Sequence, residues 1–167
     1  MTADIHHAHQ HHRHRGFTMI EMIVVVLMVG ILASAAMPLA ALHKRRTQEA
    51  ELRQALRTLR TAIDAYKRAW DQGHIEKKAD ESGYPPNLEV LVKGVPDVTS
   101  PQGARIYFLR RLPNDPLASD PALPAAATWG LRSYASPPEA PAPGKDVFDV
   151  YSLEDKLAMD GTPYRDW

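Results

Sequence analysis

An almost uninterrupted apolar run constrains this chain more than any other feature of its sequence. The run extends from Phe17 to Leu42 and is broken only by Thr18, Glu21, Gly30 and Ser34. A helix of about 20 apolar residues crosses the hydrocarbon core of a bilayer. The run therefore predicts one membrane-spanning helix.

Basic residues lie on both sides of this run. Residues Met1–Gly16 are polar and contain Arg13, Arg15 and a group of histidines: His6, His7, His9, His11, His12 and His14. This composition is typical of the basic leader of an exported or membrane protein. Histidines in a flexible leader have no fixed geometry, so a metal site there is disfavoured.

The orientation of the predicted membrane span does not follow from its flanking charges alone. Lys44, Arg45 and Arg46 follow the run, so the positive-inside rule does not decide the orientation, although a short cationic leader favours a cytoplasmic N-terminus.

A second helical pattern follows the apolar run. Apolar residues recur at alternate spacings of four and three: Leu52, Leu56, Leu59, Ile63, Tyr66 and Trp70. This spacing predicts one stripe of an amphipathic helix that stops at Gly73 and packs against the C-terminal half. One long helix over Phe17–Gln72 is expected. Pro38 should bend it near Ser34 without ending it.

The C-terminal half is rich in loops, since most of the 14 prolines lie after Tyr84. After a linker at Gly73–Gly83, Asn87 can cap a short helix closed by Gly94. A second short element is expected at Ile106–Leu112.

Two segments in this half have the composition of strands. Thr128–Ser136 and Val147–Ser152 carry β-branched and aromatic residues and flank the loop Pro137–Gly144. The predicted fold class is α+β, with a small antiparallel sheet on the apolar stripe of the long helix. The predicted segments are a leader, a membrane-spanning part, an amphipathic part and a globular region, over residues 1–16, 17–42, 43–73 and 74–167.

Composition excludes several functions. Lys and Arg total 20 and Asp and Glu total 20, so no net charge favours nucleic acid. The chain has no cysteine, which excludes disulfides and thiolate metal sites. No convergent set of catalytic side chains can be recognised, so an enzyme is not expected.

The boundary between leader and apolar run carries a recognisable motif. Arg15-Gly16-Phe17-Thr18-Met19-Ile20-Glu21 resembles the processing site of type IV prepilins and type II secretion pseudopilins. The resemblance implies that a membrane peptidase cleaves between Gly16 and Phe17 and methylates the new N-terminal Phe17. It also implies a pilin-like fold.

Glu21 has a physical reason to need a partner. A lone carboxylate in a bilayer costs a few kcal/mol, so it persists mostly where a cation pairs with it, although a position at the membrane interface would also be tolerated. The resemblance implies that this cation is the N-terminal amine of a neighbouring subunit. Glu21 is therefore the expected assembly residue.

Three further blocks resemble the major pseudopilin of type II secretion: Tyr84–Val92, Leu112–Pro116 and Phe148–Leu153. The ending Met159–Trp167 looks like a divergent branch. The resemblance implies a structural subunit of a periplasmic pseudopilus that supports export of folded proteins. The implied partners are further copies of the chain, minor pseudopilins, the prepilin peptidase and an inner-membrane platform with its ATPase. It also implies a single-pass inner-membrane protein with its C-terminal domain in the periplasm.

Calcium is the ion that the resemblance implies, in the loop after the last strand. Asp155 and Asp160 would supply carboxylates and Leu153 a backbone carbonyl, because calcium prefers hard oxygen ligands. The loop departs from the family pattern, since it has no glycine before Gly161 and carries Lys156. That ammonium could satisfy either carboxylate and make the ion unnecessary.

Two other functions remain open from the sequence. A surface type IV pilin would share the N-terminal motif, although many of these pilins have a C-terminal disulfide. A soluble periplasmic protein could result from an ordinary signal peptidase, because Ala33-Ser34-Ala35 imitates its small-residue cleavage site. Glu21 inside the apolar run argues against this second alternative.

Overall fold

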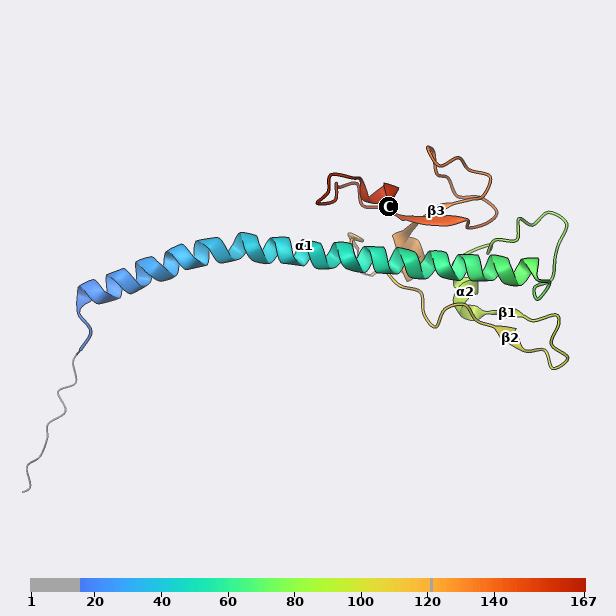
Figure 1. Cartoon of the computed structure of the whole chain (residues 1–167), viewed down its shortest axis with the longest axis horizontal. Helices are drawn as coiled ribbons and strands as arrows, with labels where there is room; N and C mark the ends of the chain where they lie inside the picture. Colours follow the sequence, from blue (N-terminus) through green and yellow to red (C-terminus); the bar gives the residue numbers. More distant parts are fainter. Residues whose placement is uncertain (1–15, 121) are drawn as a thin grey trace, which may run out of the picture. The chain divides into compact units, whose positions relative to one another are not determined.

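A computed structural model describes residues 16–120 and 122–167, apart from the side chains of residues 35–38. The chain divides into two compact units, Met1–Leu42 and His43–Trp167. Helix α1 (Met19–Asp71) contributes to both (Figure 1). The remaining elements belong to the second unit: α2 (Glu89–Lys93), β1 (Val95–Pro96), β2 (Arg105–Ile106), η1 (Ala125–Thr128), β3 (Trp129–Arg132), β4 (Asp149–Ser152) and η2 (Tyr164–Asp166).

Helix α1 confirms the predicted long helix with slightly shorter bounds. It begins at Met19 because Thr18 caps it: the Thr18 hydroxyl accepts the backbone N–H of Glu21 at 3.3 Å. It ends at Asp71, and Gly73 follows with a φ of 81°, a conformation that glycine adopts without steric cost. The helix continues through Pro38, as expected. The bend at this proline stays a prediction.

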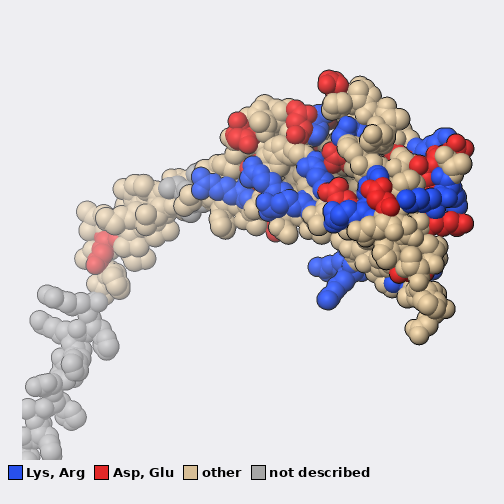
Figure 2. All heavy atoms as spheres, turned by 45° about the vertical axis from the view of Figure 1, so that its right-hand side comes forward, with Lys and Arg blue, Asp and Glu red and all other residues tan. Residues whose placement is uncertain are grey.

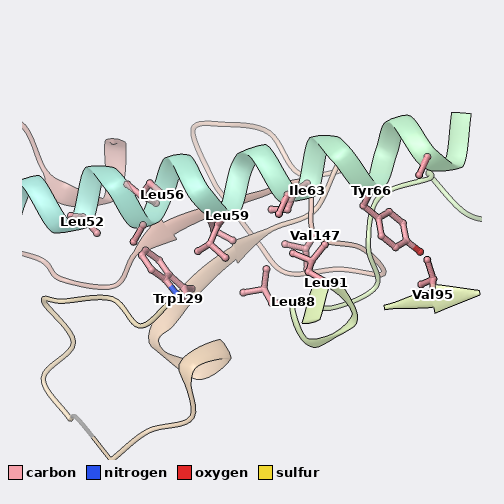
Figure 3. Packing of buried hydrophobic residues seen from close by; sticks show 14 of the residues in the cluster. Leu52, Leu56, Leu59, Ile63, Tyr66, Leu88, Leu91, Val95, Trp129 and Val147 are labelled. Carbon is pink, nitrogen blue, oxygen red and sulfur yellow. The ribbon is translucent and has the colours of Figure 1, made fainter. Parts of the chain in front are cut away.

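The apolar stripe of α1 forms one wall of the core in the second unit. Leu52, Leu56, Leu59, Ile63 and Tyr66 are buried, as the spacing predicted, and Trp70 packs partly buried beside them. Figure 3 shows the five buried side chains of the stripe beside residues of the C-terminal half: Leu88, Leu91, Val95, Trp129 and Val147. The hydrophobic free energy of this contact holds the irregular half on the helix.

The sheet is antiparallel, as predicted, but its strands are shorter than expected. Strands β3 and β4 pair from Trp129 with Ser152 to Arg132 with Asp149. The ladder stops at Arg132 because the next residue, Ser133, donates its backbone N–H to the Ala142 carbonyl at 3.0 Å. A second two-stranded sheet, β1 with β2, was not predicted, since each of its strands has two residues and carries no periodicity.

The short helix α2 confirms the predicted cap. The Asn87 side-chain oxygen accepts the Val90 N–H at 3.1 Å, and Gly94 follows the helix with a φ of 71°. The other short element was predicted over Ile106–Leu112. Of that range only Ile106 is in regular structure, as the end of β2.

Truncation of Leu59 should measure how strongly the core holds the second unit. Leu59 is fully buried at the centre of the stripe, so Leu59→Ala should lower the free energy of unfolding by about 2–5 kcal/mol. Thr61 is exposed on the same helix, and Thr61→Ala is the matched control with an expected change within about 0.5 kcal/mol. Denaturant unfolding of the detergent-solubilised chain would measure both. Equal stability of the two variants would contradict the packing of the stripe.

Candidate processing and assembly site

The predicted cleavage site lies directly before helix α1. Gly16, Phe17 and Thr18 are not helical, and Phe17 is 75% exposed. A peptidase needs an accessible, non-helical backbone at the bond that it cleaves, and the Gly16–Phe17 bond meets this requirement. The leader before Gly16 lies outside the described residues.

Glu21 lies in the first turn of α1 and is exposed. Its backbone N–H donates to the Thr18 hydroxyl at 3.3 Å, and the Met22 N–H donates to the Thr18 carbonyl at 3.2 Å. Thr18 and Glu21 therefore have the spacing of a capping box, a pattern that could have been read from the sequence. The negative side chain also lies at the positive end of the helix dipole.

The apolar run forms an exposed surface in the first unit. Its large side chains with described placement are exposed, from 43% at Val24 to 84% at Met19. This part of α1 is long and apolar enough to cross a membrane. Figure 2 shows its described surface as neutral except for one acidic spot. Such a surface requires lipid or another apolar protein surface around it.

The predicted calcium residues lie after β4. Leu153 is 56% exposed, and Asp155 is exposed beyond it. The Asp160 Oδ1 atom accepts the backbone N–H of Thr162 at 3.0 Å and its hydroxyl at 2.6 Å. These hydrogen bonds hold the pKa of the Asp160 carboxyl below its usual value. Within residues 16–120 and 122–167, no three His, Asp or Glu side chains gather where they could hold a metal ion.

The Lys156 ammonium pairs with a glutamate and not with either predicted aspartate. Its ammonium lies 3.1 Å from Glu154 Oε2, whereas Asp160 Oδ2 lies 3.7 Å from the Arg53 guanidinium. One predicted ligand, Asp160, therefore accepts two hydrogen bonds from Thr162 and lies near the positive charge of Arg53. The predicted calcium site stays a prediction: Leu153, Asp155 and Asp160 supply fewer oxygens than the roughly six to eight that the ion takes, so carbonyls or waters would have to complete its shell.

The block at Leu112–Pro116 anchors the middle of the C-terminal half. Asp115 is buried and accepts the Ser152 hydroxyl at 2.6 Å and the Leu117 N–H at 2.7 Å. Burial raises the pKa of the Asp115 carboxyl. The Trp129 indole N–H donates to the Pro113 carbonyl at 2.9 Å. These bonds tie the block to both strands of the β3–β4 sheet, a structural role that no local sequence pattern indicates.

Comparisons with known proteins agree with this geometry. Residues 11–37 match the family described as "Prokaryotic N-terminal methylation motif". The chain is 30% identical to the type II secretion system core protein G of Klebsiella michiganensis, over 79% of this chain and 88% of that protein. It is 30% identical to the protein of the same name in Pseudomonas aeruginosa, over 86% of this chain and 85% of that one. No solved structure matches this chain.

The motif and the fold together define a class, that of pilin-like proteins with an N-terminal methylation motif on a long apolar helix. Within this class the chain belongs to the type II secretion system core protein G family, the major pseudopilins. The predicted family and the predicted α+β fold are both confirmed.

Proposed function

We propose that this chain is the repeating structural subunit of the periplasmic pseudopilus of a type II secretion system, a filament that supports export of folded proteins. The observation that carries the proposal is the exposed apolar half of α1, with Glu21 in its first turn. That surface is unsuited to water and suited first to a bilayer and then to the packed centre of a filament.

Cleavage by the peptidase would allow the apolar half of α1 to move from the bilayer into the centre of a filament. Cleavage after Gly16 removes the basic leader and leaves Phe17 as the N-terminal residue, which the peptidase methylates. The new amine carries a positive charge that a neighbouring Glu21 carboxylate can pair with inside an apolar filament. The part of the chain from His43 onward has its own core and would face the periplasm.

The role is structural, not enzymatic. The partners of the subunit would be further copies of itself, minor pseudopilins, the prepilin peptidase, and the inner-membrane platform with its ATPase. Until assembly the subunit would stay in the inner membrane as a single-pass protein.

Expression with a complete secretion system would test this function. The chain should restore secretion to a strain that lacks its own major pseudopilin, and overexpression should yield filaments visible by electron microscopy. A cysteine pair introduced on neighbouring surfaces would cross-link without interference, because the chain has no cysteine. A soluble periplasmic monomer with Ala36 as its N-terminus would overturn the proposal, and surface pili without restored secretion would indicate an adhesive or motility pilin.

A further inference from the structure

We infer that the segment Leu157–Trp167 is held on α1 by a protein-only clasp, and that this pseudopilin folds and assembles without calcium. The inference rests on the proposed function only where it concerns assembly. The clasp consists of Glu49, Arg53 and Arg60 on α1 with the residues that they contact in the C-terminal segment and in β4. These three side chains lie along one flank of the helix, beside the apolar stripe.

Glu49 forms the first contact of the clasp. The residue is 5% exposed, although it lies in a charged sequence. Its Oε1 atom accepts the Tyr164 hydroxyl at 2.9 Å and the Met159 backbone N–H at 2.8 Å. Arg45 lies 3.8 Å from the same atom and also donates to the Leu157 carbonyl. A buried carboxylate with three partners holds both ends of the loop against the helix.

Arg53 forms the middle contact. Its guanidinium lies 4.0 Å from the centre of the Trp167 ring and 3.7 Å from Asp160 Oδ2. The Trp167 indole N–H donates to the Thr162 hydroxyl at 2.7 Å, and that hydroxyl donates to Asp160 Oδ1 at 2.6 Å. Asp160 Oδ1 is thus hydrogen-bonded within the loop, and Asp160 Oδ2 lies close to a positive charge on α1.

Arg60 forms the third contact and joins the clasp to the sheet. Its guanidinium donates to Asp149 Oδ1 at 2.7 Å, to the Val150 carbonyl at 3.1 Å and to the Trp167 backbone oxygen at 2.6 Å. Strand β4 and the last residue of the sequence are therefore held by the same side chain. Charge-assisted hydrogen bonds of this kind are about twice as strong as neutral ones.

The clasp lies in the region where the resemblance implies calcium. An ion at Asp160 would compete with the two Thr162 hydrogen bonds at Oδ1 and would be repelled by the Arg53 guanidinium near Oδ2. Calcium would hold such a loop closed by binding carboxylates from both of its ends. Here Glu49, Arg53 and Arg60 of α1 hold the loop closed. Hydrogen bonds and charge contacts with α1 therefore hold the loop without the ion.

Thermal unfolding of the full chain in detergent micelles would test this inference. The Tm of the parent protein should be the same, within about 1 °C, in millimolar calcium and in EDTA, because a ligand that does not bind the folded state does not stabilise it. A Tm several degrees higher in calcium, lost in the Asp155→Ala, Asp160→Ala double variant, would overturn the inference.

Variants of the clasp supply the second readout. Glu49→Gln should lower the Tm by about 5 °C in calcium and in EDTA alike, since a neutral amide oxygen accepts the two buried hydrogen bonds less strongly than a carboxylate and does not attract Arg45. The matched control is Glu51→Gln, an identical change at an exposed position of the same helix, with no expected shift. If Glu49→Gln prevents folding, Arg53→Gln serves instead, because Arg53 is half exposed. An unchanged Tm in both variants would refute the clasp.

Filament assembly should be as independent of calcium as the Tm of the subunit. Filament yield in cells or membranes should not fall when EDTA replaces calcium, whereas a loss of filaments that calcium restores would contradict the inference. Absence of filaments under every condition would instead count against the proposed function. The melting experiments on the subunit would still decide whether the clasp exists.

Discussion

The Gly16→Arg variant should accumulate in the inner membrane as uncleaved precursor, with almost no mature protein. Gly16 and Phe17 lie in exposed, non-helical backbone directly before α1. A glycine leaves room for an enzyme to approach the bond closely, whereas an arginine places a long charged side chain beside it. Mass spectrometry of the membrane-extracted chain would measure the loss, as the ratio of precursor to a product that begins at Phe17.

Gly16→Ala is the control for this variant. It keeps a small side chain at the position and should retain most of the cleavage. Equal processing of the arginine and alanine variants would show that the peptidase does not use this glycine. A product that begins at Ala36 in every variant would assign cleavage to an ordinary signal peptidase.

The long helix could be predicted because its two patterns are continuous over many residues. The apolar run and the stripe from Leu52 to Trp70 gave bounds that differ little from Met19–Asp71. The C-terminal half was harder, because strands of two or four residues carry little periodicity. The structure of this half depends on contacts between residues that are distant in sequence, such as the Asp115–Ser152 hydrogen bond. A local sequence pattern does not predict such contacts.

The charged residues of α1 beside the apolar stripe show the same limit of prediction from local sequence. A charged stripe beside an apolar one is normally solvated, and no local pattern distinguishes Glu49 from Glu51. The structure separates them: Glu49 is buried under Tyr164 and Met159, whereas Glu51 is exposed. The partners that bury Glu49 lie more than 100 residues later in the chain, so only the folded structure identifies them.

Replacement of Glu21 by alanine should have opposite effects on two steps: membrane insertion should become no harder, whereas filament assembly should weaken. A carboxylate within the apolar run costs about 2.5–3.5 kcal/mol at the centre of a bilayer and less near its edge. Glu21→Ala should therefore insert at least as well as the parent protein. The cap on α1 should survive, because Thr18 accepts the backbone N–H of residue 21 and not its side chain. Cleavage after Gly16 should proceed normally.

Assembly should respond in the opposite direction. If the Glu21 carboxylate pairs with the Phe17 amine of a neighbouring subunit, its removal leaves a buried cation without a partner, which costs about 3–5 kcal/mol. Each factor of ten corresponds to about 1.4 kcal/mol, so subunit association should weaken by at least about a hundredfold. Cross-linking of membranes, with Glu21→Gln and Glu21→Asp beside the alanine variant, would measure this. The aspartate variant should recover part of the polymer because it keeps the charge, and the glutamine variant should not. Polymer at the parent level in Glu21→Ala, with secretion intact, would show that the carboxylate is tolerated at the membrane interface and does not hold subunits together.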